Sequence, residues 1–267
     1  MTIILNEREF AEQALETCEL GEHPYNTLSC LAKYYHAEGY RDREVRRFLE
    51  NFLLKCDPSV NVFRWEKAIA RTLKTAKKYP LVEVDCVSIT AKEMAVCESL
   101  SGRELKQFRP GRHRPTQNTS RLMFTLICLA KYGNAARVGN NGWVNASDKD
   151  IFALANVSTT IRRQSFMLNK IHSMGLLQFS KKVDNVNMRV TCIDEEGEPV
   201  MQVSDFRNLG NQYMMYHGFP YIECASCGLV VPKGNNSHRL CKQCGEARNR
   251  EKTNENHWKR KGELPPS

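Results

Sequence analysis

Two pairs of cysteines near the end of the 267-residue chain constrain its fold more than any other feature. Each pair has the form C-x-x-C-G, and thirteen residues separate the second cysteine of the first pair from the first cysteine of the second. In such a unit the two sulfurs converge on one ion, and the glycine relieves the crowded backbone after the second ligand. Two units complete a tetrahedral shell of four thiolates. The sequence therefore predicts a zinc site with the ligands Cys224, Cys227, Cys241 and Cys244.

Four sulfur ligands close the coordination shell, which is typical of structural zinc, whereas a catalytic zinc keeps an open position. His238 could replace one cysteine, but four sulfurs are already available. An HNH-type nuclease also places cysteine pairs around its site, but the stretch 235–238 lacks the paired histidines that would bind its ion and activate water. We therefore expect no catalytic residues. We expect a zinc ribbon or treble-clef-like module over 220–262, with strands at 220–222 and 229–231 and a basic helix at 246–259.

The other seven cysteines occur singly, mostly among apolar neighbours, which favours reduced, buried thiols over a disulfide scaffold. The apolar run at the N-terminus is too short for a signal peptide. The sequence contains no run of about 18 apolar residues, so we expect no membrane span. We expect a soluble, cytoplasmic protein with no membrane partner. The seven cysteines are Cys18, Cys30, Cys56, Cys86, Cys97, Cys128 and Cys192.

The formal net charge of +9 is concentrated in two segments, 103–114 with +4 and 239–261 with +5. Clustered basic charge suits a polyanion, because each phosphate that is neutralised releases condensed counterions. The first segment lies in a stretch rich in proline and glycine, which predicts an extended linker over 101–119. The linker is either an arm against phosphates or a solvated hinge. The residues for phosphate contact are Arg109, Arg112 and Arg114.

The first hundred residues have the apolar periodicity of helices, with Asp42 as a candidate N-cap and a second amphipathic helix over 61–78. The second helix carries a basic stripe opposite its apolar face, which is either a binding surface or a solvated face. The region resembles the helical accessory domain of phage and plasmid primases over Tyr25–Ser59 and the helix that follows. No catalytic carboxylate cluster precedes it, so the resemblance implies a replication context without primase activity.

The pattern of residues 120–195 predicts a helix, a short helix, a tight turn, a longer helix and a β-hairpin, in this order. An apolar helix over 122–132 precedes a second helix that begins at a Ser147 cap, and Ser158 is expected to cap a third helix. Gly175 should end the third helix, with strands before and after a turn at 181–187. This order resembles the winged helix-turn-helix superfamily of bacterial regulators and phage proteins, whose second motif helix enters the major groove of DNA.

The resemblance assigns candidate DNA contacts by position. Arg can pair bidentately with guanine and Asn with adenine, while hydroxyls at the helix start would touch phosphates or base edges and cations on the wing would meet the backbone. The alternative is a protein-binding module, because the hairpin contains Asp184 and continues into acidic residues. The candidates are Ser158, Thr159, Thr160, Arg162, Arg163, Asn169, Lys181, Lys182 and Arg189.

Together these patterns predict a mainly α, α+β chain. Its leading function is non-enzymatic, zinc-containing binding to duplex DNA, in replication initiation or transcription control of a phage or mobile element. The alternative from another class is an adaptor or inhibitor that binds a host replication or transcription protein, and the third is a nuclease. The predicted divisions are 1–100 (helical), 101–119 (basic linker), 120–195 (winged helix), 196–219 (connector) and 220–262 (zinc module).

Overall fold

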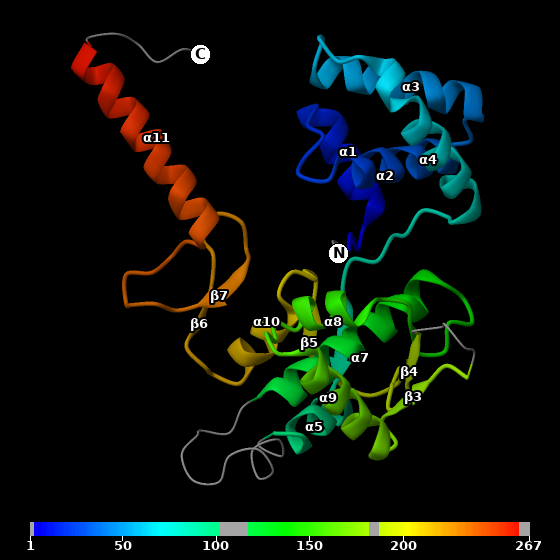
Figure 1. The fold of residues 1–267 in the computed structure, drawn as a ribbon, viewed down its shortest axis with the longest axis vertical. Helices are drawn as coiled ribbons and strands as arrows, with labels where there is room; N and C mark the ends of the chain where they lie inside the picture. The colour runs from blue at the N-terminus through cyan, green and yellow to red at the C-terminus, as the bar shows by residue number, and fades with distance from the viewer. Residues whose placement is uncertain (1–2, 102–116, 182–186, 262–267) are drawn as a thin grey trace. The chain divides into compact units, whose positions relative to one another are not determined.

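The computed structural model describes residues 3–101, 117–181 and 187–261 (Figure 1). The chain is a mixed α+β protein in which helices predominate and the strands are short. Contacts divide it into two compact units, Ile3–Cys86 and the chain from Val87 onward. Among the described residues, no helix combines the length and the apolar character needed to cross a membrane.

The first unit is a cluster of helices. Helix α3 begins directly after Arg41, because the side chain of Glu44 accepts a hydrogen bond from the Arg41 N–H, so the predicted cap Asp42 is the first helical residue instead. The predicted helix over 61–78 starts as a 3₁₀ turn, held by Asn61, before it becomes α-helical. The elements are α1 (Glu7–Thr17), α2 (Pro24–Ala37), α3 (Asp42–Cys56), η1 (Val62–Trp65) and α4 (Glu66–Lys78).

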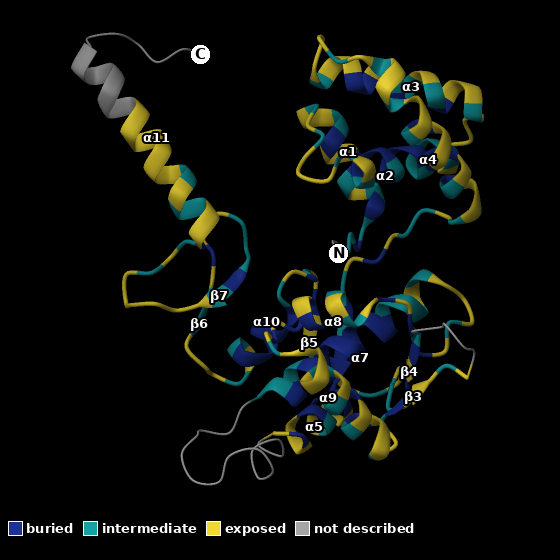
Figure 2. Ribbon diagram, viewed as in Figure 1, coloured by how far each residue is buried: buried dark blue, intermediate teal, exposed yellow. Residues whose placement is uncertain are grey.

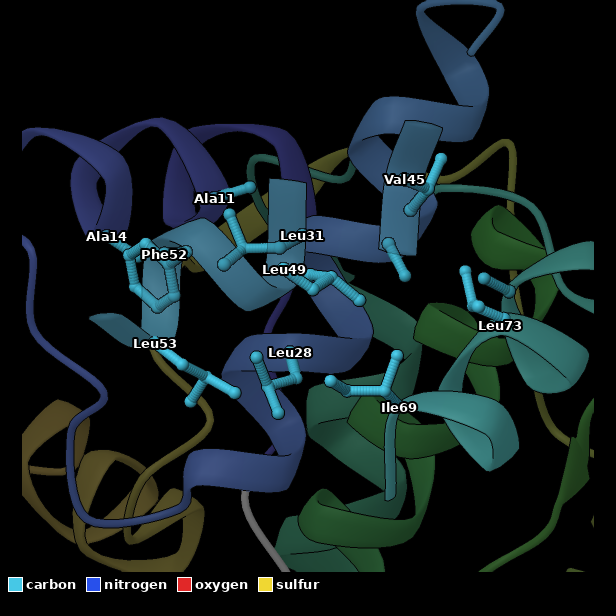
Figure 3. Close-up of a cluster of buried hydrophobic side chains, with 12 residues drawn as sticks. Ala11, Ala14, Leu28, Leu31, Val45, Leu49, Phe52, Leu53, Ile69 and Leu73 are labelled. Carbon is cyan, nitrogen blue, oxygen red and sulfur yellow. The ribbon is translucent and has the colours of Figure 1, made fainter. Parts of the chain in front are cut away.

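These helices share one core (Figure 3). The buried side chains recur at helical spacing, such as Val45, Leu49 and Leu53 on α3, and each of these is completely buried. Helix α2 contributes Leu28 and Leu31, which are also completely buried. The first unit therefore has a hydrophobic core of its own.

The second unit begins with strand β1 (Val87–Thr90), which pairs antiparallel with β5 (Pro199–Val203) more than 100 residues later. Helix α5 (Ala91–Ser99) follows and packs on α7 (Asn118–Ala136), which has more buried residues than any other described helix of the unit (Figure 2). Helix α10 (Leu209–Tyr216) packs on α7 as well.

These contacts move the expected boundaries. The segment 87–100, which we assigned to the N-terminal domain, belongs to the second unit because β1 takes its hydrogen-bond partners from β5. The segment 196–219, expected as a connector, forms β5 and the largely buried α10. Residues 102–116 of the predicted linker lie outside the described residues, and 118–119 already belong to α7.

The middle of the second unit has the element order α7, β2, α8, α9, β3, β4. Its antiparallel sheet has the strand order β2-β4-β3, with Trp143 opposite Arg189 and Gln178 on the other side of the same residue. Helix α8 begins at Ser147, whose hydroxyl accepts from the Asp150 N–H as predicted. The bounds are β2 (Trp143–Val144), α8 (Asp148–Leu154), α9 (Ile161–Ser173), β3 (Leu177–Phe179) and β4 (Met188–Val190).

Helix α9 begins later than the sequence suggested. Its N-cap is Thr160, so Ser158 lies in the preceding turn and does not cap the helix. That turn needs the left-handed backbone of Asn156, with φ of 49°. At its other end Gly175 has φ of 75°, and the Leu176 N–H reaches back to the Ile171 carbonyl at 3.3 Å, which is the predicted C-terminal stop.

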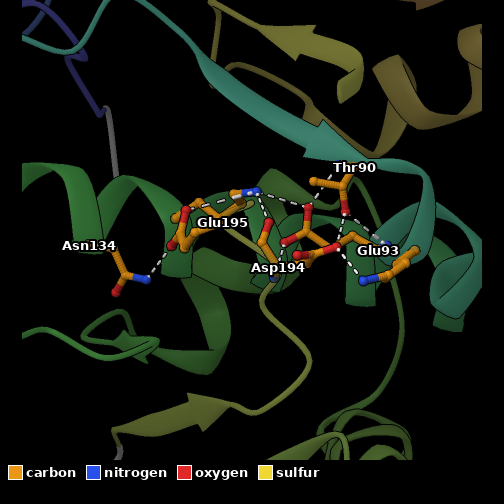
Figure 4. A network of polar contacts seen from close by, with 7 residues as sticks. Thr90, Glu93, Asn134, Asp194 and Glu195 are labelled. Carbon is orange, nitrogen blue, oxygen red and sulfur yellow. Dashed lines mark hydrogen bonds and ion pairs between the residues drawn. The ribbon is translucent and has the colours of Figure 1, made fainter. Parts of the chain in front are cut away.

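A buried ion pair ties α5 to α7 (Figure 4). The Lys131 ammonium lies 3.0 Å from the Glu93 carboxylate, and the two side chains are 7% and 0% exposed. Glu93 also accepts from the backbone N–H groups of Thr90 (2.8 Å) and Asp194 (2.9 Å). Lys131 in turn donates to the Asp194 carbonyl at 2.9 Å. These bonds fix the start of α5 against the segment that follows β4.

Candidate functional site

The four cysteines of the C-x-x-C pairs are held by a hairpin and a helix. The hairpin consists of β6 (Tyr221–Glu223) and β7 (Val230–Pro232), and the first pair occupies its turn. The Cys224 N–H donates to the Leu229 carbonyl, and the Gly228 N–H returns to the Cys224 carbonyl. Gly228 has φ of 73°, the left-handed backbone expected after the second ligand of a pair.

The second pair lies at the start of α11 (Lys242–Lys261), four residues before the helix start that the sequence suggested. Cys241 precedes the first helical residue and Cys244 lies in the first turn. The Gly245 N–H donates to the Cys241 carbonyl at 2.9 Å within the helix, so Gly245, unlike Gly228, needs no left-handed backbone. A helix N-terminus favours negative charge, so the position suits thiolates.

The sulfur geometry fits one tetrahedral ion. Metal–sulfur bonds of about 2.3 Å in a tetrahedron place the sulfurs about 3.8 Å apart. The four Sγ atoms lie within 4.8 Å of one another, and those of Cys227 and Cys241 are 3.7 Å apart. A disulfide needs about 2.05 Å, and all four are free thiols. The cluster could therefore hold a metal ion through Cys224, Cys227, Cys241 and Cys244.

Backbone N–H groups point at the sulfurs. The Cys241 N–H donates to the Cys224 sulfur at 3.2 Å, and the Cys244 N–H donates to the Cys241 sulfur at 3.5 Å. Burial alone would raise the pKa of Cys224, but N–H donors from Cys241 and neighbours lower this pKa to about 6. A hydrogen bond from Ser226 lowers the pKa of Cys244, but bonds with the neighbouring thiols outweigh it and raise this pKa to about 12. The N–H donors thus favour the thiolate form of Cys224, whereas the neighbouring thiols favour the protonated form of Cys244.

His238 does not join the cluster. Its Nδ1 accepts a hydrogen bond from the Gly234 N–H at 2.9 Å, which closes the loop between β7 and Cys241. Among the described residues, the only group of three or more potential metal ligands that lie this close together is the four-cysteine set. The four cysteines predicted as ligands therefore do lie together in the structure.

Two residues that we did not single out attach the hairpin to the rest of the unit. Asn211 on α10, only 1% exposed, donates through Nδ2 to the Val230 carbonyl at 2.9 Å. Its Oδ1 accepts from Nδ2 of Asn156 at 2.7 Å and from Nη2 of Arg121 at 3.3 Å. Arg207 donates to the Cys227 carbonyl at 2.6 Å. An asparagine inside an apolar helix is a visible sequence signal, but the sequence does not name its partners.

The first turns of α9 present the predicted reading residues to solvent. Arg162, Arg163 and Asn169 are exposed, and the opposite side of the helix is buried through Met167, Leu168 and Ile171. The Asn169 amide donates to the Ser165 carbonyl at 2.9 Å, one turn earlier on its own helix. Helix α9 thus exposes one polar face.

The remaining predicted contacts lie around α9. In the turn before it, Ser158 and Thr160 are exposed and Thr159 is half-buried. Lys181 is exposed just after β3, and Arg189 on β4 is exposed while its Nε donates to the Asn141 carbonyl at 2.8 Å. Four predicted residues lie outside the described part of the chain: Arg109, Arg112, Arg114 and Lys182.

Comparison with protein-family models, with curated proteins and with solved structures finds no match to this chain.

Proposed function

We propose that residues 118–190 form a winged helix-turn-helix domain that binds duplex DNA, with α9 as the helix that enters the major groove. Support comes from the order α7, β2, α8, α9, β3, β4 and from the strand order β2-β4-β3, which places a hairpin beside the end of α9. The observation that carries the proposal is the exposure of Arg162 and Arg163 in the first turn of α9.

The four-cysteine cluster would hold Zn²⁺ as a structural ion in this non-enzymatic protein. Zinc would supply a cross-link between the β6–β7 hairpin and the start of α11, which are otherwise joined by a polar loop and by hydrogen bonds such as that from the Ala225 N–H to the Arg239 carbonyl. With four thiolates the shell is closed, so water has no open position for activation. The basic residues of α11 and the charged linker suit a role in replication initiation or transcription control, where DNA is the substrate.

The test compares binding to a preferred duplex, selected from a random library, with binding to an unrelated duplex. Arg162→Ala and Arg163→Ala should each weaken the preferred site by about 1–3 kcal/mol and change non-specific binding less. Lys181→Ala should weaken both duplexes alike. Arg8→Ala is the matched control: it removes one positive charge, but one already paired with Glu38 and Glu83 at 2.7 and 3.0 Å. Unchanged binding in both α9 variants would remove the recognition-helix assignment.

One observation favours a second candidate, an adaptor that binds a host protein. Ile161, at the start of α9, is 81% exposed beside the two arginines, and an exposed apolar residue there suits a protein partner. The two functions differ in salt dependence. Binding to duplex DNA should weaken steeply as salt rises, whereas an adaptor should show no slope of log affinity on log salt with duplex DNA.

A further inference from the structure

Acidic and basic side chains are unevenly distributed among the helices of the first unit. Residues 7–22, which include α1, carry six acidic side chains and one basic one, whereas 41–78, from α3 to α4, carry eleven basic and five acidic ones. The whole unit has thirteen basic and fourteen acidic residues, so it is close to neutral. The basic surface is therefore a local feature of α3 and α4.

Four cationic side chains of helix α4 lie on one face of the helix. They follow one another at steps of four, three and four residues, which places them within about 60° of arc at 100° per residue. Ile69, Leu73 and Ala76 lie on the opposite side and are buried, so the cations point away from the core. We call this set the α4 stripe: Lys67, Arg71, Lys74 and Lys78, all exposed.

The α4 stripe is not neutralised by the described part of the chain. Among the described side chains, in residues 3–101, 117–181 and 187–254, no carboxylate forms an ion pair with any of its four cations. Lys77 on the same helix differs, because its ammonium lies 2.7 Å from the Asp42 carboxylate. An open groove beside the stripe, between α3 and α4, is lined by further cations, Arg43 and Arg46.

An exposed aromatic ring stands one turn before the stripe. Phe63 in η1 is 87% exposed, although its backbone N–H is held by the Asn61 side chain at 3.1 Å. Its neighbour Trp65 packs on the core and on Tyr25, with the ring centroids 5.7 Å apart. The fold thus partly buries one aromatic residue of this turn and leaves the other in solvent, next to the exposed Arg64.

We propose that the α4 stripe and Phe63 form a binding site for single-stranded nucleic acid. The four cations would contact successive phosphates and a base would stack on Phe63, the combination of charge and aromatic platform that binds single strands without sequence preference. The stripe spans about 16 Å at 1.5 Å per residue, which corresponds to about five nucleotides of a stacked strand. This site lies on the first unit and does not depend on α9.

The test uses the full chain and a fluorescein-labelled oligothymidylate, whose binding is followed by anisotropy over a range of salt concentrations. The triple variant Lys67→Gln, Arg71→Gln, Lys74→Gln should reduce the slope of log affinity on log salt by about 2.1, or 0.7 for each phosphate that the variant no longer neutralises. Lys77→Gln is the matched control from the same helix, and it should leave the slope unchanged because that charge is paired with Asp42.

Phe63→Ala should weaken oligothymidylate binding by about 5- to 150-fold and leave the salt slope unchanged, because stacking involves no phosphate. All these side chains are exposed, so melting temperatures should match that of the wild type. No binding of the oligonucleotide, or a triple variant that behaves like Lys77→Gln, overturns the proposal. So does a Phe63→Ala variant of unchanged affinity. Arg162→Ala separates the two sites: if it does not affect duplex binding, the α9 assignment fails while the stripe result stands.

Discussion

Replacing Asn211 with alanine should destabilise the second unit by removing a buried set of polar contacts. The amide forms three hydrogen bonds at a position that is 1% exposed. Without it, the carbonyl of the buried Val230 loses its partner, which costs about 1–3 kcal/mol. Asn156 is exposed and can bond to water instead, and Arg121 keeps its 2.6 Å bond to the Asn156 carbonyl, so these two losses add about 0.5–1 kcal/mol. The expected loss in free energy of unfolding is about 1.5–4 kcal/mol.

Urea unfolding of the metal-loaded protein measures this loss. The fluorescence of Trp143 in β2 reports the second unit alone when Trp65 and Trp258 are replaced by phenylalanine. Asn249→Ala is the matched control, because Asn249 is an exposed asparagine on α11, and it should change stability by less than about 0.5 kcal/mol. If Asn211→Ala shifts the urea midpoint no more than this control, Asn211 does not hold the β6–β7 hairpin to the turn before α9, and the reasoning fails.

Three further changes test other parts of the structure. Wild-type protein should bind about one zinc ion per chain, and Cys241→Ser should lose this ion and unfold the hairpin, because the free energy of metal binding in a small module is also its free energy of folding. Elemental analysis that finds no zinc in freshly purified wild type would contradict this. Glu93→Gln should cost about 3–5 kcal/mol, because it removes the 3.0 Å partner of the buried Lys131 charge and leaves only the Glu195 carboxylate, 4.0 Å away; adding Lys131→Met should restore much of the loss in urea unfolding. Gly210→Ala should cost about 1–3 kcal/mol in the same assay, since its Cβ would meet the Ala155 carbonyl, and an unchanged midpoint would show that α10 can move away.

The parts of the structure that the sequence predicted are those encoded by local chemistry. Two C-x-x-C-G units identify their four cysteines because the ligand spacing is set within each turn, and the second unit needs only one more turn to converge with the first. The Ser147 cap and the Gly175 stop are similarly local, since each depends on backbone within three to five residues. Ser158 failed as a cap because three hydroxyl residues in a row offer equivalent candidates, and the left-handed Asn156 sets where the turn ends.

What the sequence could not predict depends on distant partners. Strand β1 is short, and its pairing with β5 is decided by contacts across more than 100 residues, so the domain boundary at 86–87 has no local signal. The sequence predicts only a connector over 196–219. In the fold, Asn211 and Gln212 are buried and bonded to backbone carbonyls, which makes polar side chains part of the interior.

The contacts of Asn211 also limit how strongly a metal ion bound to the four cysteines could influence α9. One side of this amide holds the Val230 carbonyl of the β6–β7 hairpin, and the other holds Asn156, whose left-handed backbone starts the turn into α9. Any free energy that metal binding passes to that turn through Asn211 cannot exceed that of the bonds that transmit it, about 1–3 kcal/mol in total. Loss of the metal by this route would therefore change the population of the α9 arrangement by at most about 5- to 150-fold. Complete unfolding of the middle of the unit would require the packing of α7 on α5, α8 and α10 to break as well.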